Sequence, residues 1–371
     1  METVSLARLK DCMLRAECGA ELTIGFLGGS ITQGSLATKP ENCYAYIVFS
    51  WWKQAFPKAV FHYVNGGIGG TTSHFGAARV ETDVLMYQPD VVVVDFSVND
   101  DADAFFQETY EGVIRKILTW HCAPAVILLN NVYYDTGKNA QDYHNAVGDW
   151  YQIPHVSIKD TLYKRMKAGM YTRGELTPDG LHPSDKGHAL VAAELITFLE
   201  HVKACMPKLD MSNLSMHEKE ETAFTKLPEP MTANMYEHAK RLTIREISPQ
   251  LIGFRTDTEE KTGHLDFFKN GWIGQKAGDR ILFKVTCSCI GVQYRRTIKR
   301  PALCAKVVVD GDTEHAKILD GNFDEDWGDC LALEPVLHHG ECKEHIVEIT
   351  ILDSQENTDI TPFYLLSLIV A

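Results

Sequence analysis

Ser30 is the residue of this sequence best placed to act as a nucleophile. It follows two glycines that close the apolar run Leu22 to Leu27. Such a run predicts a buried strand, and the glycines predict a sharp turn at its carboxyl end, where open α/β sheets bind their ligands. The segment is not a G-x-S-x-G elbow, because position 32 is Thr. Taken alone, it is equally consistent with an ordinary turn.

A carboxylate and an imidazole occur together in the segment Asp179-Gly180-Leu181-His182-Pro183. Pro183 disfavours helical backbone at His182, so both side chains are expected on one loop. At this spacing the Asp179 carboxylate can accept a hydrogen bond from Nδ1–H of His182, while Nε2 faces outward. A lone histidine is usually structural, but a histidine with an orienting acid is half of a catalytic triad.

Two further segments offer hydrogen-bond donors to a developing oxyanion. The glycine-rich loop Asn65 to Ser73 follows a predicted strand, and its backbone N–H groups can approach a ligand closely. A phosphate loop is the rival interpretation, but both the Walker ending and the G-x-G-x-x-G pattern are missing. Asn99, at the end of a valine-rich strand, can supply a side-chain amide donor. The alternative for Asn99 is an Asx turn that closes the strand.

The elements that must position these segments predict an α/β fold. Fully apolar strands that alternate with amphipathic helices are typical of a parallel sheet covered on both faces. We expect strands at 22–27, 60–64, 91–96 and 125–129, and helices at 1–20, 44–55, 109–120 and 184–202, the last capped by Ser184.

The sequence changes character after residue 205. Residues 206–235 contain three prolines and the charge run Glu218 to Glu221, which predicts a linker between domains. Residues 236–371 alternate apolar and polar positions, which predicts an antiparallel β-sandwich with a hairpin turn at Asp310-Gly311. We expect its strands at 242–244, 280–285, 292–294, 305–309, 345–352 and 363–370. The predicted domains are therefore residues 1–205 and 236–371.

The composition is typical of a soluble globular protein and argues against several classes of partner. The 371 residues carry a net charge of −14, which disfavours binding to nucleic acid or to anionic membranes. No apolar run is long enough to span a membrane, and charged residues interrupt the N-terminal 20 positions where a signal peptide would be apolar. The ten scattered cysteines favour reduced thiols. We therefore expect a cytoplasmic protein.

Taken together, the four segments resemble the blocks of the SGNH (GDSL-type) hydrolase superfamily, in the same order over residues 22–202. The resemblance implies that Ser30 is the nucleophile of a triad with Asp179 and His182. Two departures are visible, because Gly-Gly-Ser replaces the usual Gly-Asp-Ser, and Ser97 stands where the family commonly has glycine.

The resemblance also implies an oxyanion hole formed by Ser30, Gly70 and Asn99. Gly70 matches the family by its place in the frame Asn-x-x-x-x-Gly-x-Thr-Ser, and Gly67 and Gly69 remain alternatives. Loss of one such donor typically lowers turnover 10²- to 10³-fold.

The order of the two domains is similar to that of bacterial two-domain carbohydrate O-acetyl esterases active on mannan. This similarity implies a serine esterase that deacetylates plant-derived oligosaccharides, such as acetylated manno-oligosaccharides, with no cofactor. The second domain would then resemble a jelly-roll carbohydrate-binding module. Trp327, in the polar loop Asp320 to Asp329, is a candidate sugar contact, because aromatic faces stack on sugar rings. The aspartates of that loop lack the spacing of an EF-hand, so no metal site is predicted.

Two other functions are consistent with the sequence. One is a thioesterase or lysophospholipase of the same fold, which would favour long acyl chains over acetyl groups. The other is a sugar-binding protein without catalysis, against which the intact Ser30, Asp179 and His182 argue. The oligomeric state is open, and a homodimer is one of the alternatives.

Overall fold

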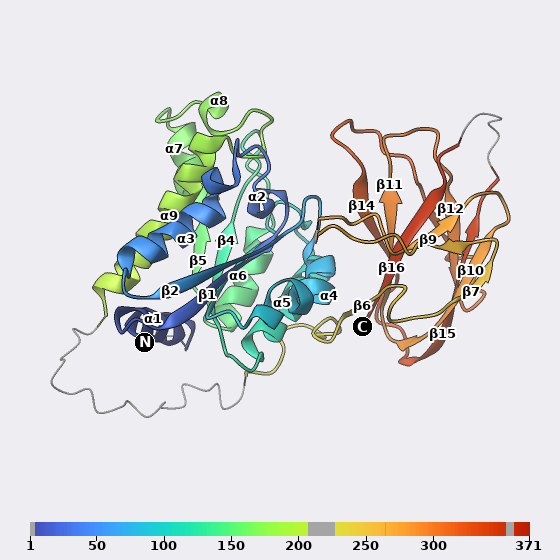
Figure 1. The fold of residues 1–371 in the computed structure, drawn as a ribbon, viewed down its shortest axis with the longest axis horizontal. Coiled ribbons are helices and arrows are strands. Elements are labelled where there is room, and N and C mark those ends of the chain that lie inside the picture. Colours follow the sequence, from blue (N-terminus) through green and yellow to red (C-terminus); the bar gives the residue numbers. More distant parts are fainter. Residues whose placement is uncertain (1–3, 207–226, 264, 354–359) are drawn as a thin grey trace. The chain divides into compact units, whose positions relative to one another are not determined.

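The structure is a computed structural model that describes residues 4–206, 227–263, 265–353 and 360–371 (Figure 1). The chain divides into two compact units, Met1–Glu237 and His238–Ala371. Most of the predicted linker, residues 207–226 with the charge run Glu218 to Glu221, lies outside the described residues.

The first unit contains a five-stranded parallel sheet, which confirms the predicted α/β class. The strand order is β2-β1-β3-β4-β5, so after β2 the chain crosses back over β1 and adds β3 on its other side. In this order the carboxyl ends of β1 and β3 lie side by side, with Gly28 opposite Asp95. The strands are β1 (Glu21–Gly28), β2 (Val60–Gly67), β3 (Val91–Asp95), β4 (Ala125–Asn130) and β5 (His155–Ser157).

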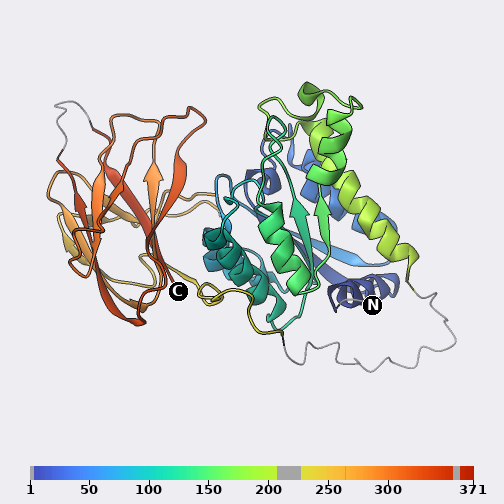
Figure 2. The same cartoon turned by 180° about the vertical axis from the view of Figure 1, so that it is seen from behind.

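Helices cover both faces of this sheet (Figure 2). Alternate residues of β1, β3 and β4 form one core with α1 (Val4–Glu17), α3 (Tyr44–Ala55) and α9 (Asp185–Ala204). The other face carries α4 (Ser73–Asp83), α5 (Ala104–Leu118) and α6 (Gln141–Trp150). Shorter helices are α2 (Ser30–Gln33), α7 (Lys164–Lys167) and α8 (Arg173–Leu176), with η1 (Pro40–Asn42), η2 (Leu85–Tyr87) and the π-helical η3 (Lys159–Tyr163).

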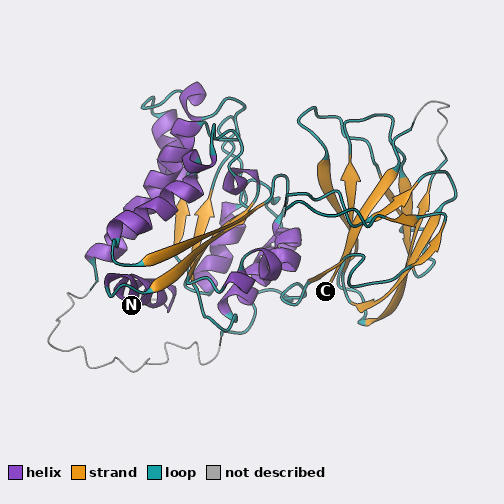
Figure 3. Ribbon diagram, viewed as in Figure 1, coloured by secondary structure: helices purple, strands orange, loops and turns teal. Residues whose placement is uncertain are grey.

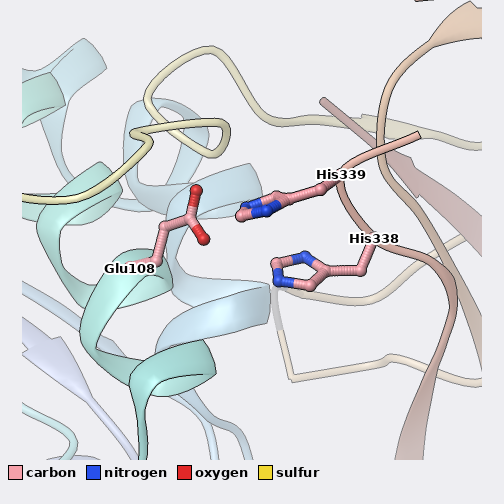
Figure 4. Close-up of side chains that lie close together, drawn as sticks. All are labelled: Glu108, His338 and His339. Carbon is pink, nitrogen blue, oxygen red and sulfur yellow. The ribbon is translucent and has the colours of Figure 1, made fainter. Parts of the chain in front are cut away.

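The last described segment of the first unit, residues 227–237, packs along α5. Glu108 of α5 (Figure 4) accepts a hydrogen bond from the Met235 N–H at 2.9 Å. About two turns further along the same side of α5, Arg115 donates from Nε to the Glu237 carboxylate at 2.6 Å. These contacts fix the segment to the first unit, so that compact unit continues beyond the residue 205 at which the sequence suggested its end.

The second unit is a sandwich of two antiparallel sheets, as predicted (Figure 3). One sheet has the order β13-β12-β15-β10-β7, and the other has the order β14-β11-β16-β9-β8, with β6 paired to β16. The inward-facing side chains of both sheets share one apolar core. The strands are β6 (Lys240–Leu242), β7 (Gln250–Ile252), β8 (Arg255–Thr256), β9 (Trp272–Gly274), β10 (Arg280–Cys287), β11 (Ile290–Arg296), β12 (Ala305–Val309), β13 (Lys317–Leu319), β14 (Cys330–Leu337), β15 (Lys343–Ile351) and β16 (Phe363–Val370).

The predicted turn at Asp310-Gly311 lies between the antiparallel strands β12 and β13. Both residues have positive φ, 54° at Asp310 and 76° at Gly311, the backbone that favours these residue types. After β14, the imidazole rings of His338 and His339 stack with centroids 4.0 Å apart (Figure 4).

All ten cysteines are free thiols, as the sequence suggested. Cys12, Cys43, Cys287 and Cys289 are buried. Among the described residues, the helices are all too short or too polar to cross a membrane.

Candidate active site

Ser30 begins the short helix α2 directly after β1 and the single residue Gly29. Its side chain lies at the carboxyl edge of the parallel sheet and is 7% exposed. The turn is tight, because a Cβ atom on Gly29 would lie 2.1 Å from Oδ1 of Asn99. The helix ends at once, since Gly34 adopts a left-handed backbone with φ 100°. The sequence motif thus forms the sharp strand-to-helix turn expected of it.

The loop of residues 179–183, called the histidine loop below, brings Asp179 and His182 to Ser30. His182 Nε2 lies 2.8 Å from Ser30 Oγ, and His182 Nδ1 lies 2.6 Å from Asp179 Oδ2. The other carboxylate oxygen of Asp179 accepts from the backbone N–H groups of Leu181 and His182 at 2.9 and 2.8 Å. Three residues that lie far apart in the sequence therefore form one hydrogen-bonded chain.

The Asp179 carboxylate is stabilised as an anion. Partial burial opposes ionisation, but the hydrogen bonds from the His182 ring and from two backbone N–H groups outweigh it and lower the pKa of Asp179 to about 2. Asp179 is therefore ionised at neutral pH and accepts the proton on Nδ1 of His182. That tautomer leaves the lone pair of Nε2 directed at the Ser30 hydroxyl.

Two contacts outside the triad hold the histidine loop. Arg173 donates from Nε and Nη2 to the Asp135 carboxylate at 2.9 and 3.0 Å, and from Nη1 to the Pro178 carbonyl at 2.6 Å. The Gly180 carbonyl accepts from the Tyr134 N–H at 2.7 Å. The loop then enters α9 through the predicted cap, because Ser184 Oγ accepts from the Gly187 N–H at 3.2 Å.

The glycine-rich loop lies beside Ser30. A Cβ atom on Gly69 would lie 3.6 Å from Cβ of Ser30. The N–H groups of Gly67, Ile68 and Gly69 already donate to Asn65 Oδ1, the Gly28 carbonyl and Gln33 Oε1. Within the described parts of the chain, the N–H of the exposed Gly70 has no acceptor. Of the three glycines considered from the sequence, Gly70 is thus the one with a backbone donor available to a ligand.

Asn99 reaches the same place from the end of β3. Its backbone N–H and that of Asp100 both donate to the Phe96 carbonyl, which forms a tight turn after the strand. Its side-chain amide lies against Gly29 and has no hydrogen-bond partner among the residues that the structure describes. A backbone turn therefore closes the strand, while the side chain of Asn99 makes no Asx-turn hydrogen bond to any described residue. This turn presents the amide beside the nucleophile.

A buried arginine that the sequence did not reveal joins the glycine loop to the nucleophile strand. Arg79 of α4 is 2% exposed and donates from Nη2 to the Gly28 carbonyl at 2.9 Å and to Thr71 Oγ1 at 3.2 Å. Its Nη1 binds the Gly66 carbonyl and, at 2.8 Å, the Asp83 carboxylate. The only sequence signal is a lone arginine in an otherwise small and apolar helical face.

Asp95, the last residue of β3, is a buried carboxylate near the site. Its two oxygens accept from Asn131 Nδ2 at 2.7 Å and from Ser97 Oγ at 3.2 Å. Burial raises the pKa of Asp95 to about 6, although the hydrogen bonds from Asn131 and Ser97 oppose this shift. The Ser97 that replaces the family's usual glycine is thus part of this polar network.

The stability of Asp95→Asn relative to the wild type is expected to increase as the pH rises. Between about pH 4 and pH 6 the folded wild type binds a proton at Asp95 that the unfolded chain has lost, so wild-type stability falls over this window. Asparagine does not ionise, so the variant does not lose stability in this way. The free energy of unfolding of both proteins is measured with urea. The value for the variant minus that for the wild type should increase by up to about 3 kcal/mol between pH 4 and pH 7. Asp101→Asn, at an exposed position, serves as the control, and a difference independent of pH would contradict the prediction.

Trp327 lies in the second unit, in the loop before β14. Its side chain is 56% exposed, and its Nε1 donates to the Glu325 carboxylate. The rings of Trp327 and Phe323 are packed edge to face, with their centroids 5.0 Å apart. Two neighbouring aspartates are engaged in the sandwich, because Asp324 pairs with Arg300 at 2.6 Å and Asp329 accepts from Thr297 Oγ1 at 2.6 Å.

A serine at the carboxyl edge of a parallel sheet, hydrogen-bonded to a histidine that is itself held by an aspartate, is the arrangement of a serine hydrolase. The model of the GDSL-like lipase/acylhydrolase family matches residues 26–190. The chain belongs to this family, and it is a carboxylic ester hydrolase.

Two solved structures are similar to the chain over nearly its whole length. Both are of a two-domain esterase (CEX) active on acetylated mannans, and one was co-crystallised with mannopentaose. The mannopentaose structure is 47% identical, has a TM-score of 0.90, and aligns over 98% of this chain and 94% of that chain. The other is 48% identical, also with a TM-score of 0.90, over 98% and 95% of the two chains. A comparison with curated proteins found no match.

Proposed function

We propose that this enzyme removes O-acetyl groups from plant-derived oligosaccharides, with acetylated manno-oligosaccharides as its substrates. The observation that carries the substrate class is the 47% identity, over both units, to an esterase active on acetylated mannans. The observation that supports the chemistry is the hydrogen-bonded chain from Ser30 through His182 to Asp179.

In the proposed mechanism, Ser30 Oγ attacks the carbonyl carbon of the acetyl ester while His182 Nε2 takes the hydroxyl proton. The bond between the carbonyl carbon and the sugar oxygen then breaks, and His182 returns the proton to the leaving sugar hydroxyl. A water molecule attacks acetyl-Ser30 with His182 again as the base, and acetate leaves as Ser30 regains its proton. Throughout, Asp179 holds the imidazole and stabilises the imidazolium.

The tetrahedral oxyanion would accept hydrogen bonds from the backbone N–H of Ser30, the N–H of Gly70 and the side-chain amide of Asn99. Ser30 is the first residue of α2, where a backbone N–H has no partner within the helix. Gly70 and Asn99 each have a donor that no described residue occupies. Three converging donors of this kind stabilise charge that develops only in the transition state.

The substrate is tested by comparing catalytic efficiency on three kinds of ester. We expect acetate release from acetylated manno-oligosaccharides to exceed that from acetylated xylo-oligosaccharides and hydrolysis of long-chain acyl esters and acyl thioesters. Preference for long acyl chains would replace the proposal with a thioesterase or lysophospholipase. Binding of manno-oligosaccharides with no hydrolysis of any ester would indicate a sugar-binding protein.

Gly29→Ala is expected to lower kcat about 10²-fold, the typical cost of one oxyanion donor. The added methyl group would lie 2.1 Å from the Asn99 amide oxygen, which is too close for van der Waals contact, and would displace the amide from the site. The loss should match that of Asn99→Ala, measured with a small aryl acetate. Gly174→Ala is the matched control, because a Cβ atom there meets nothing within 4 Å. A Gly29→Ala enzyme with kcat near the wild-type value would contradict the assignment of Asn99.

Trp327 is proposed as a sugar contact because its ring is largely exposed and an indole face stacks on a sugar ring. Trp327→Ala should raise the Kd for manno-oligosaccharides about tenfold, equivalent to about 1.4 kcal/mol. Turnover of a small aryl acetate should not change. Ile318→Ala, which removes an equally exposed apolar side chain of the same unit, is the control. An unchanged Kd in the tryptophan variant would remove Trp327 from the binding site.

A further inference from the structure

Asp100 is a buried carboxylate next to Asn99 in the sequence, and the mechanism above makes no use of it. Its side chain is 0% exposed, and it follows Asn99 in the turn that closes β3. Its Oδ1 accepts from the Ser73 N–H at 2.8 Å, and its Oδ2 lies 3.0 Å from His144 Nε2.

Ser73 begins α4 and lies three residues after Gly70. Its hydroxyl is also engaged, with Thr109 Oγ1 at 2.6 Å. The hydrogen bond from Ser73 N–H to Asp100 therefore joins the segment that carries Gly70 directly to the segment that carries Asn99. The side chain of Asp100 thus links the two donor segments.

His144 of α6 holds the second oxygen of Asp100. Its ring is buried and stacks on Tyr110 with centroids 3.7 Å apart and planes 3° apart. Because a carboxylate only accepts hydrogen bonds, Nε2 is the donor to Asp100. Nδ1 is buried and has no partner among the described residues, so the tautomer with its proton on Nε2 leaves no N–H unsatisfied there.

Burial of this carboxylate costs free energy, which its two hydrogen bonds only partly offset. Burial raises the pKa of Asp100, while the contacts with His144 and Ser73 lower it. A role in stability alone does not explain this buried carboxylate, because the cost of desolvating its charge offsets much of what its hydrogen bonds contribute to stability. What the carboxylate supplies is a fixed geometry, since it accepts from two donors on different helices.

We propose that Asp100 is a positioning residue that sets the spacing between the Gly70 N–H and the Asn99 amide, with His144 fixing its carboxylate. The inference rests on the proposed function, because it assigns those two groups to the oxyanion hole. Asp100 touches no reacting atom. Its effect is to hold two donors where a displacement of about 1 Å can cost 10²-fold in rate.

The test compares Asp100→Ala with Asp100→Asn, using a small aryl acetate as substrate. Alanine removes both hydrogen bonds, and kcat should fall about 10- to 100-fold with KM within about 3-fold of the wild type. Asparagine keeps an oxygen for the Ser73 N–H, and its amide can donate to His144 Nε2 once the ring proton moves to Nδ1. That variant should recover kcat to within about 5-fold of the wild type.

Asp103→Ala is the matched control for stability. Asp103 lies in the same connection between β3 and α5 and caps α5 by accepting from the Phe106 N–H at 2.9 Å, so its loss destabilises the fold without touching either donor segment. Its kcat should not change. An unchanged kcat in folded Asp100→Ala, an equal loss in Asp100→Asn, or an equal loss in Asp103→Ala would each overturn the proposal.

If Asp100→Ala does not fold, His144 supplies a second pair of variants. His144→Phe keeps the ring stacked on Tyr110 but removes the donor, and kcat should fall about 10-fold. His144→Gln keeps an N–H for Asp100 and should retain kcat, and equal values of kcat in the two variants would overturn the proposal.

A wild type active on aryl acetate but not on acetylated manno-oligosaccharides would contradict only the proposed substrate, because the aryl acetate series tests Asp100 by itself.

Discussion

Ser30→Ala is expected to abolish acetate release, with a loss of about 10⁶-fold in kcat, the scale seen when the nucleophile of a serine hydrolase is removed. The alanine leaves the turn intact, because among the described residues the Ser30 hydroxyl is hydrogen-bonded to His182 alone, at 2.8 Å, and not to the backbone of the turn. The measurement is acetate release from acetylated manno-oligosaccharides, together with labelling by a serine-directed phosphonate.

The control for this substitution is Ser50→Ala, because Ser50 Oγ donates to the Tyr46 carbonyl within its own helix α3, away from Ser30. That variant should keep full activity and full labelling. A Ser30→Ala enzyme that still released acetate at a rate within 100-fold of the wild type would show that another residue attacks the ester.

Asp179→Asn is expected to lower kcat about 10⁴-fold while the loop keeps its conformation. The amide oxygen can still accept from the N–H groups of Leu181 and His182, but the amide nitrogen would then face His182 Nδ1. A donor in that place requires the imidazole proton to move to Nε2, where it points at Ser30 and cannot accept the hydroxyl proton. The measurement is kcat on acetylated manno-oligosaccharides.

The stability of the wild type depends on the same carboxylate at low pH. A pKa of about 2 keeps Asp179 ionised at neutral pH, and its contribution to the free energy of unfolding is lost only as the pH falls from about 4 through 2.

The control for Asp179→Asn is Asp101→Asn, at an exposed position, which should not change kcat. A loss smaller than about tenfold in Asp179→Asn would contradict the role of Asp179 in setting the tautomer.

The sequence predicted those elements whose buried face is apolar. Residues 44–55 show the clearest helical stripe, and α3 has the predicted bounds, with Trp51 and Trp52 buried. The helix α6 was missed because its buried face is polar. Gln141 and His144 point inward there and bind Asp160 and Asp100, so no apolar period marks the helix.

The strand β14 was missed for a related reason. Its sequence contains Pro335, which argues against a central strand. In the structure β14 is at the end of its sheet, and the pairing of Pro335 with Gly291 adjoins an irregularity in the register. An edge strand tolerates proline because one side of its backbone needs no partner.

For the candidate site, the sequence predicted the residues proposed to carry the chemistry, but not the residues that hold them in place. Ser30, Asn99, Asp179 and His182 occur in compact motifs, and the structure brings each of them to the carboxyl edge of the sheet or to the loop beside it. The contact between Asp100 and His144 joins positions 44 residues apart, which no local pattern can reveal.

The most direct test of the account is to trap the acyl-enzyme. Wild-type protein is mixed with manno-oligosaccharides carrying isotopically labelled acetyl groups, quenched in acid within a turnover, digested and analysed by mass spectrometry. We predict labelled acetyl on Ser30 and on no other residue. Labelled acetyl on a different side chain, or labelled acetate formed with no acetylated peptide at any quench time, would contradict the proposed nucleophile.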